Sequence, residues 1–168
     1  MEGFMSERLL ATMLLCGLAS VGSAQTKISG TSQCNKPVTA YVLPAGDRPD
    51  HSFGLTKLKC TWSRPMVMAG AQMQQDEITV LSEISGNTSS DRSYVVGTFS
   101  NGDKVFVRPV GKAVLAGGKP QSSAGTWAYV GGTGQFTNVR GHGTFKCRSN
   151  SDGSSTCDIE GNYHIPKR

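Results

Sequence analysis

The sequence has little charge, few aromatic residues and few histidines for its length of 168 residues. Only 17% of the residues are charged, which is too few for an intrinsically disordered chain. Its histidines, His51, His142 and His164, lie far apart and no Cys-x-x-Cys motif occurs, so no metal site is predicted. The basic residues are spread singly without interleaved aromatics, which predicts no nucleic-acid partner. Without an internal repeat or a low-complexity linker, the sequence favours one domain.

One apolar stretch needs an explanation of its own. It runs from Leu9 to Ala19 and is followed by small residues that end at Ala24. This order is typical of a secretory signal, so residues 1–24 are predicted to be cleaved off, whether translation starts at Met5 or at the first residue. The stretch is too short for a permanent transmembrane helix, so no integral membrane span is predicted. We therefore expect a secreted or periplasmic protein whose residues 25–168 form a single β-barrel domain.

The predicted mature chain keeps four of the five cysteines, Cys34, Cys60, Cys147 and Cys157. An even number in an oxidising compartment predicts disulfides, and four cysteines allow three connectivities. The last two flank a polar loop that has the composition of a hairpin tip, so we predict Cys147–Cys157 and, with the remaining two, Cys34–Cys60. Loss of the signal also removes two acidic residues and one basic residue, which raises the net charge from +5 to +6.

Apolar and polar residues alternate along much of the remaining chain, which is the pattern of half-buried β-strands. The Asn101-Gly102 dipeptide between two such segments is a strong hairpin signal. Turn signals recur at the spacing of a sandwich or barrel, and we predict an all-β fold, a closed antiparallel barrel of about eight strands. The pattern of the segment Ser63–Asp76 fits either a short helix or a strand. The predicted strands are Val38–Leu43, Ser52–Trp62, Ile78–Ile84, Ser93–Ser100, Lys104–Val110, Gly125–Val130, Gly141–Cys147 and Thr156–Ile165.

The most specific local pattern is a glycine-rich stretch late in the chain. Gly131, Gly132 and Gly134 are followed by Phe136 and then by Gly141. Glycines between two strands supply positive φ angles and let backbones approach closely, and Phe136 is placed to cap the end of a barrel. A phosphate-binding loop is not predicted, because the third glycine of that motif is missing and no helix follows.

This stretch resembles the corresponding turn of the allene oxide cyclase and dirigent barrels. Two other features are similar and occur in the same order: Gly46-Asp47 followed by Phe53, and Asp158–Ile165 at the place of their last strand. The resemblance implies an eight-stranded antiparallel barrel with an apolar interior, no cofactor, and possible association into a homo-oligomer. It extends to small secreted bacterial proteins, to which it assigns no reaction.

The candidate site residues form two groups. Asp47 matches a motif position of the cyclases, and His51 lies four residues further on, so these two are the candidate catalytic groups; a turn residue and a solvated strand end are the alternatives. A bulge at Thr56–Lys57 is expected to turn both ends of its strand toward the interior. Core packing and surface exposure are the alternatives for the second group. The candidate ligand-binding residues are Phe53, Cys60, Trp62, Arg108, Trp127 and Tyr129.

Three functions fit these features. The first is a secreted, non-enzymatic barrel that binds a small apolar ligand or an envelope partner at its mouth. The second, implied by the resemblance, is a cofactor-free isomerase or cyclase, which requires Asp47 and His51 to reach one enclosed cavity. The third is a structural envelope protein whose barrel is filled by its own side chains.

Overall fold

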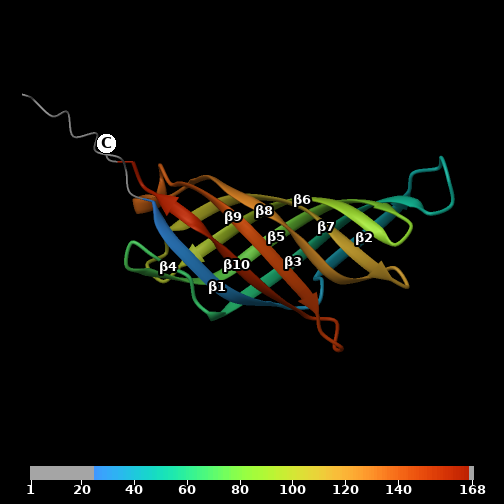
Figure 1. The fold of residues 1–168 in the computed structure, drawn as a ribbon, viewed down its shortest axis with the longest axis horizontal. Coiled ribbons are helices and arrows are strands. Elements are labelled where there is room, and N and C mark those ends of the chain that lie inside the picture. Colours follow the sequence, from blue (N-terminus) through green and yellow to red (C-terminus); the bar gives the residue numbers. More distant parts are fainter. Residues whose placement is uncertain (1–24, 167–168) are drawn as a thin grey trace, which may run out of the picture.

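The computed structural model describes residues 25–166, which form ten β-strands and one short 3-10 helix (Figure 1). The predicted cleavage site after Ala24 lies outside these residues. Among them no helix is long and apolar enough to cross a membrane. The elements are β1 (Thr26–Cys34), β2 (Thr39–Pro44), β3 (His51–Arg64), β4 (Val67–Met68), β5 (Ala71–Ser85), β6 (Thr88–Phe99), β7 (Lys104–Ala116), β8 (Lys119–Gly132), η1 (Gly134–Phe136), β9 (Arg140–Ser149) and β10 (Ser155–His164).

Eight of the ten described strands close into a barrel. Their order is β3-β1-β10-β9-β8-β7-β6-β5, and β5 pairs with β3 to complete the circle. All these neighbours are antiparallel, so the predicted all-β fold and closed antiparallel barrel of eight strands are confirmed. The two extra strands lie at opposite ends: β2 pairs with residues 52–57 of β3, and β4 pairs with the start of β5. Closure leaves the eight barrel strands without a free edge along their shared length.

Alternation along each strand decides which side chains face the interior. On β5, Ile78 and Val80 face inward and are partly buried. Leu81, the next residue after Val80, is 59% exposed on the outer face. On β3 the pairing with both neighbours is unbroken across residues 52–57. The bulge expected at Thr56–Lys57 is therefore wrong, and Phe53 points outward, because an unbroken strand keeps strict two-residue alternation.

The segment Ser63–Asp76 is mostly strand rather than helix. It contains the end of β3, all of β4 and the start of β5. Ala69 and Gly70 have φ angles of 46° and 82° and form the tight turn between β4 and β5. The turn folds β4 back onto β5 at one end of the barrel, where methionines of this segment enter the core.

The barrel is filled with side chains at the end that carries β4 and η1. Phe136 is fully buried and its ring stacks on Phe99, with the centroids 4.3 Å apart. Val105 is also fully buried beside them. Gly134 has a φ of 52°, and its missing Cβ leaves room for the Asp103 carboxylate, which accepts a backbone N–H bond from η1 at 3.1 Å. The glycine-rich stretch thus forms a turn that holds Phe136 as a plug.

Both predicted disulfides are confirmed. Cys34–Cys60 joins β1 to β3, and Cys147–Cys157 joins β9 to β10. Each bridge links residues that lie directly opposite each other in neighbouring strands, with Cα atoms 3.9 and 4.0 Å apart. The bridges join two adjacent pairs of strands, β3 with β1 and β10 with β9, on one side of the barrel.

Candidate functional site

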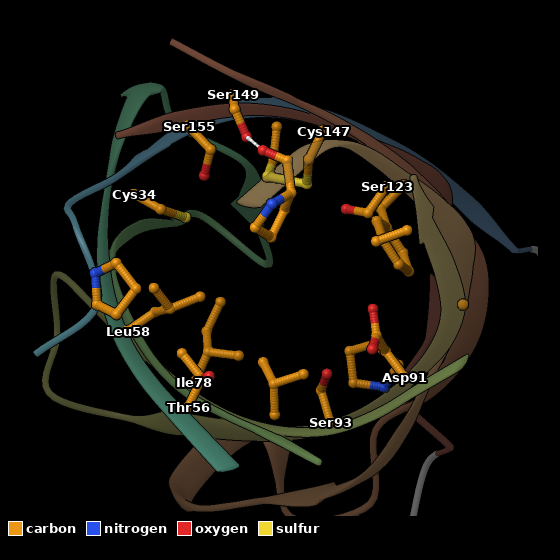
Figure 2. A pocket seen from close by; sticks show the side chains of 18 of the residues that line it. Cys34, Thr56, Leu58, Ile78, Asp91, Ser93, Ser123, Cys147, Ser149 and Ser155 are labelled. Carbon is orange, nitrogen blue, oxygen red and sulfur yellow. Dashed lines mark hydrogen bonds between the residues drawn. A yellow bond between two sulfur atoms is a disulfide. The ribbon is translucent and has the colours of Figure 1, made fainter. Parts of the chain in front are cut away.

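The end of the barrel away from the plug is hollow. A cavity of about 1100 Å³ begins between the β1–β2 connection and the β7–β8 and β9–β10 hairpins, and it reaches inward along the barrel. Figure 2 shows side chains from several strands arranged around this opening. Its middle section is apolar and is lined by Leu58, Ile78, Val80, Val95 and Val107. The cavity is therefore an apolar sleeve with one open mouth.

Glycines allow the indole of Trp127 to lie against the wall instead of across the cavity. The ring covers Gly143 and Gly161, where an added Cβ would come within 2.6 and 2.5 Å of the indole Cζ2. The indole N–H donates a hydrogen bond to the carbonyl oxygen of Thr144 at 3.1 Å, which fixes the ring in that position. A larger residue at either glycine would collide both with this ring and with a backbone carbonyl oxygen of the neighbouring strand, Glu160 for Gly143 and His142 for Gly161.

Small residues also widen the cavity around Asp91. Ser82, Asp91, Gly111 and Gly125 are successive partners across β5, β6, β7 and β8, and Phe145 continues the row on β9. The Phe145 ring lies over the two glycines, where a Cβ would stand 2.8 and 2.9 Å from it. The immediate neighbours of Asp91 in this row are thus a serine and a glycine, and its carboxylate points into the opening (Figure 2).

A second carboxyl group, Asp76, lies deeper in the cavity. Asp76 is 8% exposed, and its carboxyl group accepts a hydrogen bond from the indole N–H of Trp62 at 3.1 Å. Burial raises the pKa of Asp76 to about 7, and the Trp62 hydrogen bond acts in the opposite direction. Gly97 lies opposite on β6, and a Cβ there would be 2.9 Å from Asp76 Oδ1. The inner part of the cavity thus holds a carboxyl group that exchanges its proton near neutral pH.

Tyr129 completes the inner part of the cavity. Its hydroxyl donates to Met68 Sδ at 3.1 Å, and its ring meets Trp127 edge-on with centroids 4.9 Å apart. Burial, and then the nearby charges of Asp76 and Tyr163, raise the pKa of the Tyr129 hydroxyl. It therefore stays neutral and presents an aromatic surface to the cavity.

The predicted ligand-binding residues divide between the two faces of the barrel. Trp62, Trp127 and Tyr129 line the cavity. Cys60 is buried in its disulfide and is not part of the lining. Phe53 and Arg108 lie on outward positions of β3 and β7, where Phe53 is 50% exposed, because strand alternation turns them away from the interior.

Asp47 and His51 are brought together, but outside the cavity. His51 Nδ1 lies 2.7 Å from Asp47 Oδ1, and its Nε2 lies 3.2 Å from Glu83 Oε1 on the outer face. The hydrogen bond with His51 holds the pKa of Asp47 below its ordinary value. Neither residue lines the cavity, so the geometry that a cyclase site at Asp47 and His51 requires is not formed.

The two carboxyl groups of the cavity, Asp76 and Asp91, were not among the predicted site residues. Each shares its side of a strand with inward-facing residues, Asp76 with Ile78 and Asp91 with Val95. A polar residue on the apolar side of an alternating strand is the signal that could have found them. Within residues 25–166 no three His, Cys, Asp or Glu side chains gather as metal ligands would.

Comparisons with solved structures place the chain among small barrels. It is similar to a DUF3224-family protein of unknown function from Shewanella oneidensis MR-1, with a TM-score of 0.53 and 14% identity over 86% of this chain and 100% of that one. It is also similar to the pterocarpan synthase dirigent protein GePTS1 (TM-score 0.46, 16% identity, 86% and 88% covered) and to pyocyanin demethylase (0.44, 12%, 79% and 98%). No protein-family model and no curated protein matches the sequence. At this identity the first likeness shows a shared fold and nothing finer.

Proposed function

We propose that this protein binds one small apolar or amphipathic molecule inside its barrel and does so without a cofactor. The observation that carries the proposal is the cavity of about 1100 Å³, which is open at the mouth and ends at Met66, Met73 and Tyr129, residues of the core that also contains Phe136. Ligand pockets typically measure roughly 300 to 1,000 Å³, so this space suits a single small molecule. A barrel that served only as a structural element would gain stability by filling this half as it fills the other.

We also propose that the barrel, residues 25–168, acts outside the cytoplasm after removal of residues 1–24. The two disulfides support this, since such bridges persist in oxidising compartments. The net charge of +6 expected after cleavage favours attraction to an anionic cell envelope, where a partner could meet the mouth of the barrel. Association into a homo-oligomer stays a prediction of the family resemblance.

A second candidate function is a cofactor-free isomerisation within the cavity. Asp76 favours it, because a carboxyl group with a pKa of about 7 can both take up and release a proton at neutral pH. In this candidate Asp76 replaces Asp47 and His51 as the proton-transfer group, and the apolar sleeve holds the substrate. Conversion of a bound ligand by the wild type but not by Asp76→Asn would support it.

The binding proposal is tested by filling the cavity. Ser93 of β6 faces the interior of the barrel, and Ser90 of the same strand faces outward. Ser93→Phe and Ser90→Phe are therefore a matched pair. We expect the fluorescent probe N-phenyl-1-naphthylamine to bind the wild type and Ser90→Phe with equal affinity. Ser93→Phe should weaken probe binding roughly tenfold or more, because its ring occupies the same space.

Native mass spectrometry of protein purified from its own host provides a second test. A co-purifying small molecule that is absent from Ser93→Phe supports the proposal. Equal probe binding by both phenylalanine variants, with no retained molecule in the wild type, refutes it.

A further inference from the structure

Asp91 is placed in the cavity wall with an unused hydrogen-bonding atom. Its Oδ1 is buried and has no hydrogen-bond partner among residues 25–166, whereas Asp91 itself is only partly buried, so its other oxygen, Oδ2, is the one that a ligand in the cavity can reach. The neighbours across the sheet, Ser82 and Gly111, are small and carry no charge. A carboxylate oxygen in such surroundings is stabilised by a donor, and a cationic donor gives the strongest bond.

The charged groups that line the cavity are arranged by depth. Within the described residues, the lining cations are Lys36 and Lys119, and both belong to the mouth. Lys36 lies beside the β9–β10 hairpin, where its charge acts on Asp152. Below the mouth the charged lining residues are Asp91 and, further in, Asp76. The wall below the mouth therefore favours positive charge.

The apolar sleeve begins directly below Asp91. Val95, one of its lining residues, lies four residues further along β6, and Gly97 opposite Asp76 lies two residues beyond that. Six residues of strand span roughly 20 Å, so a molecule held at Asp91 has room to extend an apolar chain toward Tyr129. A cationic head and an apolar body match this order of groups.

We propose that the cavity selects cationic amphiphiles, with an ammonium group paired to Asp91 and an apolar chain in the sleeve below it. This inference rests on the proposed binding function and adds the chemical class of the ligand. Asp91 acts as the residue that sets specificity, whereas the apolar wall supplies affinity for any apolar chain.

The test uses three probes with the same chain and different heads: octylammonium, octanol and octanoate. The two tryptophans of the chain, Trp62 and Trp127, both line the cavity, so their fluorescence reports binding directly. We expect the wild type to bind octylammonium most tightly and octanoate most weakly. Asp91→Asn should lower the affinity for octylammonium roughly tenfold or more and leave that for octanol unchanged, because it removes charge without changing size.

Asp152→Asn is the matched control, since it removes a carboxylate at the mouth of the same cavity. It should keep the preference for octylammonium. The inference is overturned if the wild type binds octylammonium and octanol equally, if Asp91→Asn keeps the preference, or if both variants lose it alike. Binding of octanol and N-phenyl-1-naphthylamine without a preference for the cation refutes this inference alone. If no probe binds, the proposed function fails with it.

Discussion

Replacing the buried Asp76 by asparagine should stabilise the protein at neutral and alkaline pH. The carboxyl group has a pKa of about 7 in the folded protein against 3.8 as the ordinary value, because burial disfavours its charged form. Asparagine keeps an oxygen that accepts the Trp62 hydrogen bond and has nearly the same volume. The substitution therefore removes the titration and little else.

The expected size follows from the two pKa values. Between pH 4 and 7 the folded protein holds a proton on Asp76 and the unfolded chain does not, so the stability of the wild type falls as pH rises. The slope is about 1.4 kcal/mol per pH unit, and the loss adds up to about 4 kcal/mol once the pH has passed 7. Asp47 and Asp152 have lowered pKa values, so their contributions are lost below this range instead. A small domain is stable by roughly 5–15 kcal/mol, so the effect is easily measured.

Urea unfolding at several pH values from 4 to 8, followed by tryptophan fluorescence, measures this difference. We expect the two proteins to be equally stable near pH 4 and Asp76→Asn to be more stable by several kcal/mol at pH 8. Glu77→Gln changes the next residue of β5, whose side chain faces solvent, and should not reproduce the slope. A difference between Asp76→Asn and wild type that does not vary with pH would refute the reasoning.

Four further variants test the plug, the two disulfides and the packing around the Trp127 ring. Phe136→Ala should lower the free energy of unfolding in urea by about 3–5 kcal/mol, since it leaves a cavity in the filled end; a loss below 1 kcal/mol would contradict the plug. Replacing both cysteines of a bridge by serine should cost about 3.5 kcal/mol for Cys34–Cys60 and about 2.7 kcal/mol for Cys147–Cys157, given sequence separations of 26 and 10; equal or reversed losses would count against the loop-entropy argument. Gly161→Ala would bring a Cβ against the His142 carbonyl oxygen and within 2.5 Å of the Trp127 ring, so it should lower the free energy of unfolding and shift the tryptophan emission; unchanged stability and spectra would show that the close packing around this glycine is not needed.

The strand pattern was readable from the sequence because each strand carries its own alternation. Ile78, Val80 and Ile84 identified the inner side of β5 without any knowledge of its neighbours. The first strand, β1, was not predicted because its own alternation is weak. Its inward positions include Gly30 and Ser32, which give no apolar signal. A sequence pattern predicts a strand whose position depends on its own alternating residues. It does not predict a strand that is held in place mainly by pairing with its neighbours.

The candidate site depends on residues that are distant in the sequence. Asp76 and Asp91 belong to different strands, and only the pairing of β5 with β6 places both in one cavity. His51 appeared suitable from its spacing to Asp47, yet the unbroken register of β3 turns it to the outer face. A shift of one residue would have reversed every such assignment, because successive side chains point to opposite sides of a strand.

By itself, the sequence determined the class of fold, the disulfide pairs and the turn that carries Phe136, because each follows from composition, alternation or spacing over a short stretch. Only the tertiary structure decided that one half of the barrel is filled and the other hollow. That outcome depends on register across strands, which sets Gly143 and Gly161 beneath Trp127 and sets Ser82 and Gly111 beside Asp91. Whether the interior is packed or open is a property of facing rows of side chains, and no single strand contains such a row.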